Sequence, residues 1–176
     1  IYNAWKNKKI AIVNAPGSGV ADDKAVYAFV PKMIKFFLQE DPIIPQVKTY
    51  VCAFKKDLNY VINNIEKLVL KPVNESGGYG ILIGPQSSKP ELKKYKSKIL
   101  DNPRNFVAQP LIKLSTSPTL INKKILPRHL DLRPFILSGK NSFVTKGGLT
   151  RVAMKKGSTI VNSSQGGGSK DTWIAN

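Results

Sequence analysis

The sequence is poor in cysteine, histidine and acidic residues, and each shortage excludes a class of protein. With Cys52 as its only cysteine, the chain forms no intrachain disulfide. A zinc site is not indicated, because Cys52 and His129 are the only residues of the two types that bind zinc most often. His129 also stands in no pattern typical of a Ser-His-Asp triad.

Long apolar runs are missing as well. No run reaches the roughly 18 apolar residues of a membrane helix, and the opening residues IYNAWKNKKI lack the apolar stretch of a signal peptide. A lone cysteine fits a reducing compartment. We therefore expect a cytoplasmic protein without a membrane partner. The 176 residues are 41% hydrophobic and 22% charged, which is a globular composition.

The shortage of acidic residues leaves a strongly basic chain. Lys and Arg number 28 against 11 Asp and Glu, a net charge of +17. Such an excess attracts polyanions, including nucleic acids and nucleotide phosphates. The lysines are scattered, however, and the aromatic residues are not interleaved with arginines as a base-stacking surface requires. A nucleic-acid-binding protein is therefore kept as the less favoured alternative.

The spacing of apolar residues predicts an α+β protein in which strands dominate the second half. Helices are predicted within residues 22–41, 57–68 and 87–100. Asp22 or Asp23 is expected to cap the first helix and Pro31 to kink or divide it, while Ser88 and Glu91 have capping-box spacing. Strands are predicted early in KKIAIVNAPGSG and at residues 49–52, 67–73, 80–84, 105–114, 130–137, 142–145, 149–154 and 159–161, with an antiparallel sheet in the second half.

Two glycine-rich segments are candidates for phosphate binding. APGSGVADD imitates a dinucleotide fingerprint, but Asp22 replaces its third glycine and would face the pyrophosphate, so a plain capped turn is favoured. SGGYG follows the strand LVLKPV directly. It is either a simple hairpin turn or a loop whose backbone N–H groups fold over an anion that the Lys71 ammonium also contacts. Phosphate is the anion of best fit.

Polar residues also interrupt the predicted strands further along the chain. Asp131 and Arg133 are two residues apart in PRHLDLRPFIL, so they point to one face of a strand. This pattern is typical of a structural salt bridge, of an exposed sheet face or of a functional site. Arg151 lies in the later segment KGGLTRVAM, and VNSSQGGGSKD is a polar loop that buries little.

Six collinear segments carry a resemblance that runs from about Ile10 to Ile174. They are GVADDKAVYAFVPKMI, LVLKPVNESGGYGILIGP, NPRNFVAQPLI, PRHLDLRPFILSG, GGLTRVA and VNSSQGGGSKDTWI. Together they resemble the C-terminal part of the circularly permuted type 2 ATP-grasp proteins, a family often labelled glutathionylspermidine-synthase-like. The resemblance implies two α+β lobes with antiparallel sheets that enclose a nucleotide cleft, preceded by the edge of a pre-ATP-grasp unit. Residues 1–20 would end that upstream unit, 21–108 form the first lobe, and 109–176 form the hinge and the second lobe.

The same resemblance assigns roles to individual residues. Lys71 would contact the α- and β-phosphates of ATP, and the glycine loop would close over them, with Tyr79 as a shield. A hinge from Gln109 to Ile112 would read the adenine edge, and arginines of the second lobe would stabilise charge on the transferred phosphoryl group. The nucleotide-binding set is Lys71, Gly77, Gly78, Tyr79, Gly80, Gln109, Leu111, Ile112 and Asp131, the catalytic set Arg133 and Arg151, and the acceptor-substrate set Asn162, Ser163, Ser164 and Lys170.

The function implied is an ATP-dependent carboxylate–amine ligase that acts through an acylphosphate on substrates that the sequence does not identify. Magnesium is implied too, but its carboxylates and asparagine should lie in an E-x-N-like segment, and none of the four glutamates lies in one. That segment is expected upstream, so the chain is interpreted as a C-terminal fragment that lacks the metal ligands and is inactive alone. An upstream half of the same protein would then be a partner. A non-catalytic nucleotide-binding or structural module is the alternative.

Overall fold

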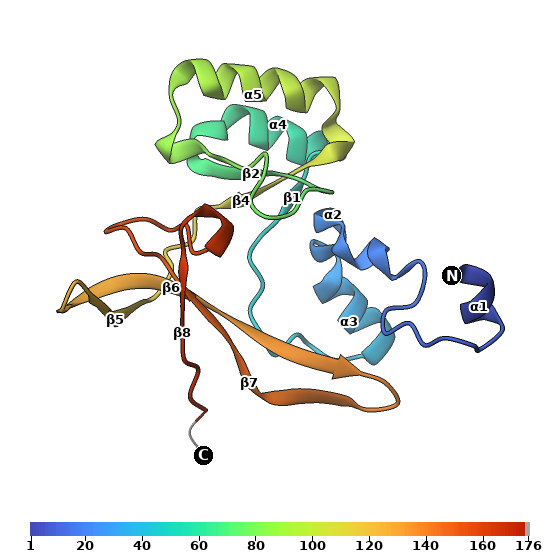
Figure 1. The fold of residues 1–176 in the computed structure, drawn as a ribbon. Coiled ribbons are helices and arrows are strands. Elements are labelled where there is room, and N and C mark those ends of the chain that lie inside the picture. Colours follow the sequence, from blue (N-terminus) through green and yellow to red (C-terminus); the bar gives the residue numbers. More distant parts are fainter. Residues whose placement is uncertain (175–176) are drawn as a thin grey trace. The chain divides into compact units, whose positions relative to one another are not determined.

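A computed structural model describes residues 1–174 of the chain. The chain divides into two compact units, one from Ile1 to Leu111 and one that begins at Ile112 (Figure 1). Each has its own four-stranded antiparallel sheet, which confirms the predicted α+β class. No helix within residues 1–174 is both long and apolar enough to cross a bilayer.

The first unit opens with short helices. They are α1 (Tyr2–Lys6), the 3-10 helix η1 (Ser18–Asp22), α2 (Lys24–Tyr27) and α3 (Val30–Leu38). Asp23 caps α2 by accepting a 2.8 Å hydrogen bond from the Ala25 N–H, and Pro31 lies in the first turn of α3. The predicted cap and the predicted division of this helix are both confirmed.

The strand predicted early in KKIAIVNAPGSG is wrong. Residues 8–13 form no strand, and the Val13 side chain is 96% exposed. The apolar run Ile10–Val13 resembles a buried strand in composition, but a strand needs a hydrogen-bonding neighbour. The sheet of the first unit is built from four later strands, and none of them pairs with this segment.

The sheet of the first unit has the order β1-β4-β2-β3. Its strands are β1 (Tyr50–Val51), β2 (Leu68–Pro72), β3 (Leu82–Ile83) and β4 (Phe106–Pro110). Two helices cover one face of it, α4 (Lys55–Asn63) and α5 (Lys89–Asp101) (Figure 1). Three 3-10 turns, η2 (Ile65–Lys67), η3 (Gly84–Gln86) and η4 (Pro103–Asn105), link these elements.

Alternation along β2 separates a core face from a less buried face. Leu68 and Leu70 are buried against the helices, whereas Lys71 stands on the opposite face, half-buried. The core under α4 and α5 consists of Cys52, Val61, Ile65, Leu68, Leu70, Tyr95, Ile99, Phe106 and Ala108. A smaller cluster on the other side joins Ala25 of α2 to Val51, Val73 and Val107. Side chains therefore pack against both faces of the sheet. On the second face a cavity lies beside Lys71.

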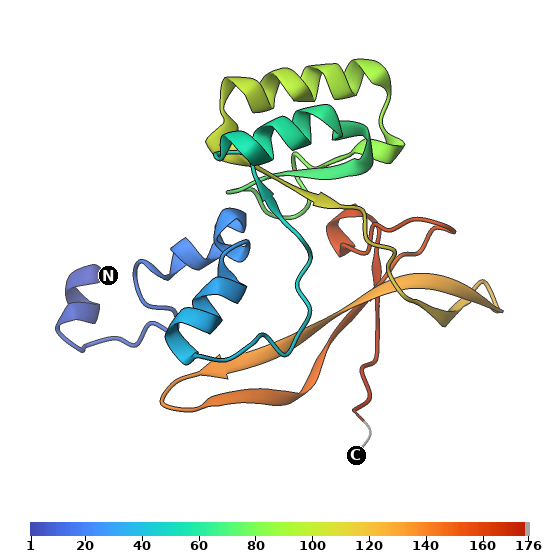
Figure 2. The same cartoon turned by 180° about the vertical axis from the view of Figure 1, so that it is seen from behind.

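The second unit is mostly sheet, in the order β5-β6-β7-β8. Its strands are β5 (Thr116–Ile121), β6 (Lys124–Ser138), β7 (Ser142–Val152) and β8 (Gly168–Lys170), with a 3-10 turn η5 (Ser163–Gln165) before β8. β6 pairs with β5 through its first part and with β7 through its second, where the two form a long hairpin (Figure 2). Residues 142–145 and 149–154, predicted as separate strands, belong largely to β7. Residues 159–161 form no strand, and β5 and β8 were not predicted.

Candidate functional site

Lys71 is held on the open face of the first sheet by a side-chain hydrogen-bond network. Its Nζ donates to Gln109 Oε1 at 2.6 Å, and Gln109 Nε2 donates to Thr49 Oγ1 at 2.8 Å. The register explains the first contact: Lys71 pairs with Val107 and Val69 with Gln109. Lys71 and Gln109 are therefore diagonal neighbours on one face, within reach of long side chains.

A cavity of about 360 Å³ lies in the first unit beside this network. Its lining is Ala21, Asp22, Asp23, Lys24, Tyr27, Val47, Lys71, Val107 and Gln109. Burial lowers the pKa of the Lys71 amine, and the nearby positive charge of Lys24 lowers it further. Two ammonium groups that repel each other across one cavity favour an anion between them.

Lys24 was not among the predicted site residues. Its ammonium donates to the backbone carbonyl of Glu75, and its backbone N–H donates to the Val73 carbonyl at 3.1 Å. The start of α2 is thereby tied to the segment that leads into the glycines. The sequence showed only a lysine after two capping aspartates, and only the tertiary packing of α2 on the sheet brings Lys24 to Lys71.

The predicted glycine loop is a tight turn after β2. Gly77, Gly78 and Gly80 all have positive φ, a conformation that residues with a side chain rarely adopt. A Cβ on Gly80 would also lie 2.8 Å from Pro72 Cγ. The turn is anchored at one end, where the Tyr95 hydroxyl donates to the Gly80 carbonyl at 2.5 Å. Tyr79, the residue expected to shield a phosphate, is 69% exposed.

The predicted hinge residues lie at the end of the first unit. Gln109 and Pro110 complete β4, and Leu111 is the last residue of this unit. Ile112 begins the second unit, and both Leu111 and Ile112 are exposed. The side chain of Gln109 is committed to Lys71 and Thr49, so a contact of Gln109 with a base would have to use its backbone.

In the second unit, Asp131 and Arg151 face each other across β6 and β7 and form a two-pronged ion pair. Arg151 Nε donates to Asp131 Oδ1 at 2.9 Å, and Arg151 Nη2 donates to Asp131 Oδ2. These hydrogen bonds, together with the positive charges of Arg151 and Arg133, hold the pKa of the Asp131 carboxyl below its usual range. Arg133 is exposed. Of these two predicted catalytic arginines, only Arg151 has a direct carboxylate partner within residues 1–174.

The predicted acceptor-substrate residues are tied to their own unit. Asn162 Nδ2 donates to Ser164 Oγ at 2.9 Å, and Ser163 starts η5. Lys170 on β8 reaches β5, where its Nζ donates to Ser117 Oγ at 3.3 Å and to the Pro118 carbonyl. The structure thus packs these four residues into a compact turn and a cross-sheet contact.

Magnesium ligands are not gathered in the described part of the chain. No group of three or more His, Cys, Asp and Glu side chains that could hold a metal lies within residues 1–174. Asp22 and Asp23 line the cavity, but Asp23 already accepts hydrogen bonds from the Ala25 N–H at 2.8 Å and from Arg104 at 3.0 Å. Asp23 is therefore engaged with the protein itself, and Asp22 lines the cavity next to it.

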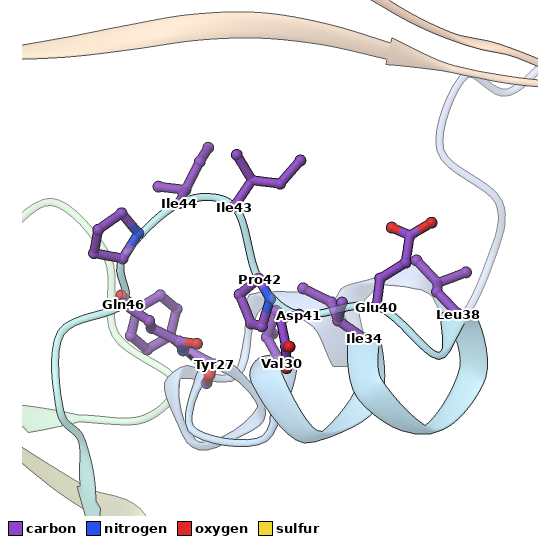
Figure 3. A pocket seen from close by; sticks show the side chains of 11 residues that line it. Tyr27, Val30, Ile34, Leu38, Glu40, Asp41, Pro42, Ile43, Ile44 and Gln46 are labelled. Carbon is purple, nitrogen blue, oxygen red and sulfur yellow. Dashed lines mark hydrogen bonds between the residues drawn. The ribbon is translucent and has the colours of Figure 1, made fainter.

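A second cavity of about 410 Å³ lies between α3 and the segment that follows it (Figure 3). Val30, Ile34 and Leu38 line it from the helix, and Ile43 and Ile44 belong to the segment that follows. It contains none of the predicted site residues. The lysine-lined cavity is therefore the better candidate for chemistry.

The fold and the site together define an α+β protein with a cavity lined by two lysines, and the family follows from comparison. A family model described as circularly permuted ATP-grasp type 2 matches residues 1–153. The chain belongs to this family, as the resemblance of its motifs predicted.

The relatives of the chain are longer proteins. An uncharacterized protein of Synechocystis sp., sll0335, is 51% identical over 175 residues, which are 99% of this chain and 36% of that protein. An uncharacterized protein of Mycobacterium tuberculosis, Rv2411c, is 49% identical over 175 residues, 99% of this chain and 32% of that protein. A Frankia casuarinae protein named putative glutamate--cysteine ligase 2-2 is 45% identical over 174 residues, 99% of this chain and 20% of that protein. The chain spans about a third or less of their length.

Proposed function

We propose that the chain forms the nucleotide-binding part of an ATP-dependent carboxylate–amine ligase. In this reaction ATP phosphorylates a carboxylate, and an amine then displaces the phosphate from the acylphosphate to form an amide or peptide-like bond. Membership of the ATP-grasp family supports the reaction class, and the name of the Frankia casuarinae relative supports a ligase. The observation that carries the proposal is the Lys71 ammonium, which donates to Gln109 and lines a cavity together with Lys24.

The residues of the first unit would act on the phosphates. Lys71 and Lys24 supply two positive charges that neutralise phosphate oxygens, and the backbone N–H groups of the glycine turn can approach them because no Cβ intervenes. In the second unit we propose that Arg133 stabilises the charge on the transferred phosphoryl group, because its side chain is exposed and forms no ion pair within residues 1–174. Arg151, the other arginine of the predicted catalytic set, is bound to Asp131 on the neighbouring strand.

We propose further that the magnesium ligands lie in polypeptide beyond these 176 residues. The length of the Synechocystis relative, which is about three times that of the matched region, supports this. The chain alone would then bind nucleotide without turnover, as a non-catalytic module does.

Calorimetric titration of the chain with ATP tests the proposal. We expect saturable binding that Lys71→Met reduces at least tenfold, because an ammonium that contacts phosphate contributes about 1.5–3 kcal/mol. Lys94→Met is the matched control, since Lys94 lies exposed on α5 and the substitution removes the same charge. Addition of magnesium chloride should not tighten binding to this chain.

Three outcomes would contradict the proposal. Equal affinities of the parent and Lys71→Met would remove Lys71 from the site. Tighter binding with magnesium chloride would show that the metal ligands are present within the chain after all. No binding of ATP, even to a version of the chain extended by an upstream segment, would refute the nucleotide function itself.

A further inference from the structure

The side chain of Gln109 has a fixed orientation that the ligase proposal does not explain. A lysine ammonium can only donate hydrogen bonds, so the Gln109 oxygen, which accepts from Lys71 at 2.6 Å, is identified by chemistry. The amide nitrogen must then point the other way, toward Thr49 Oγ1 at 2.8 Å. The Thr49 hydroxyl in turn donates to the Val47 carbonyl at 3.1 Å. Every hydrogen bond in this relay runs in the same direction, from Lys71 to the backbone.

The sheet places the three side chains of this relay next to each other. β4 lies between β1 and β2, and Tyr50 pairs with Ala108, so continuation of that register by one residue puts Thr49 opposite Gln109. Gln109 therefore bridges from the central strand to both neighbours. A glutamine is suited to this place because one amide offers both an acceptor for Lys71 and a donor for Thr49.

We propose that Gln109 is a positioning residue: its amide holds the Lys71 ammonium in the cavity and, through Thr49, ties it to the backbone at Val47. This inference rests on the proposed function for its purpose, since the cation so placed is the one assigned to the phosphates. It also links two parts of the site. The backbone of Gln109 is expected to belong to the hinge, while its side chain would orient the phosphate-binding Lys71.

The surroundings of Lys71 explain why its ammonium needs a hydrogen-bond acceptor such as Gln109. Lys71 is half-buried, and the charge of Lys24 repels it from the far side of the cavity. The other titratable groups that line the cavity are Asp22, Asp23 and Tyr27, and neither aspartate accepts a hydrogen bond from Lys71 in the described part of the chain. The neutral amide of Gln109 is thus the acceptor that steadies the ammonium without cancelling the charge that a phosphate would need.

Titration of Lys71 in the full chain, without nucleotide, tests the positioning directly. The rate at which acetic anhydride acetylates Lys71, followed by mass spectrometry across pH, reports the pKa of this amine, because only the neutral amine reacts. Gln109→Met removes the acceptor of the ammonium, so we expect the midpoint of the curve of acetylation rate against pH to move to lower pH. Gln109→Glu adds a negative charge at the same place, so we expect it to move to higher pH. Thr49→Val should produce a smaller change in the direction of Gln109→Met.

The control is Gln86→Met, an exposed glutamine in η3 that is remote in sequence from the relay. Opposite movements in the two Gln109 variants cannot come from loosened packing, which both would share. Unmoved midpoints in folded Gln109→Met and Gln109→Glu proteins would overturn the proposal. If Gln109→Met proved unfolded by circular dichroism, Gln109→Glu and Thr49→Val would decide the question in the same way.

Titration with ATP separates this inference from the ligase proposal. We expect Gln109→Met to bind ATP about tenfold more weakly than the parent, because a charge-assisted hydrogen bond no longer orients Lys71. If the acetylation midpoints move as expected and even the parent fails to bind ATP, the positioning role stands and the nucleotide function fails. If ATP binds the parent and Gln109→Met equally, positioning by Gln109 is not what phosphate binding depends on, and the inference fails.

Discussion

At the scale of single residues, Asp131 is both a candidate site residue and the partner of Arg151 in an ion pair between two strands. Asp131 and Arg133 were expected on one face of a strand, which β6 confirms, but the sequence left open whether Asp131 would form a salt bridge or contact a nucleotide. The structure pairs Asp131 with Arg151 through two hydrogen bonds on adjacent strands. Only the register of β6 against β7 decides this, and register depends on contacts far apart in sequence.

The pair predicts a stability that depends on pH. Hydrogen bonds from Arg151 lower the pKa of Asp131 below its usual value of 3.8, so the folded state binds fewer protons than the unfolded state near that pH. The pair therefore stabilises the fold fully above about pH 4, and this contribution disappears as pH falls through the lowered pKa. We expect Asp131→Asn to cost on the order of 1 kcal/mol at pH 7 and progressively less below pH 4, measured by urea unfolding.

Asp171→Asn is the matched control for this prediction. Asp131 and Asp171 are the only acidic residues after Ile112, and Asp171 is exposed and takes part in no ion pair within residues 1–174. Its substitution should leave the free energy of unfolding nearly unchanged from pH 3 to pH 7. If Asp131→Asn lowered the free energy of unfolding by the same amount at every pH in that range, the carboxylate charge would not be the cause of the loss.

At the scale of elements, local signals predicted helices well. Ser88 and Glu91 were expected to form a capping box, and in the structure the Ser88 side chain accepts from the Glu91 N–H while the Glu91 carboxylate accepts from the Ser88 N–H. These contacts involve residues three apart, so the sequence contains all the information that they need. The division of the helix near Pro31 is local in the same way.

Strands were predicted less well because their partners are distant. Residues 8–13 have the composition of a strand but no neighbour, whereas β5, rich in serine and threonine, is a strand because β6 pairs with all of it. The glycines in KGGLTRVAM suggested a break between two strands. β7 instead continues through them, since Gly148 lies opposite Pro134 and a Cβ there would come within 2.9 Å of the Arg133 carbonyl.

The capping box gives a prediction for one element. Ser88→Ala removes the side-chain acceptor at the start of α5, so we expect a loss of about 1 kcal/mol in the free energy of unfolding by urea. Ser97→Ala is the control, because Ser97 lies exposed in the middle of α5 and caps nothing. A loss from Ser97→Ala as large as that from Ser88→Ala would indicate that helix propensity, not the cap, produces the effect.

At the scale of the whole molecule, the net charge of +17 leaves two classes of anion to distinguish. The lysines on α4 and α5, on the face of the sheet opposite Lys71, are spread over exposed positions. A polynucleotide would contact many such charges at once, whereas a triphosphate in the cavity would meet chiefly Lys71 and Lys24. The two modes differ in how many counterions they release, and therefore in their dependence on salt.

This difference yields a last prediction, measured by fluorescence anisotropy with labelled ATP and a labelled mixed-sequence single-stranded DNA. ATP affinity should fall gently between 50 and 200 mM salt and be reduced by Lys71→Met. DNA affinity, where detectable, should fall by orders of magnitude over that range, as expected when roughly six or more phosphates are neutralised, and should not change with Lys71→Met. DNA binding that persists at 200 mM salt while ATP fails to bind would favour the nucleic-acid alternative. Displacement of the DNA by ATP in the parent but not in Lys71→Met would instead place both anions in the cavity. The loss of Lys71 affects their competition only if both bind beside this residue.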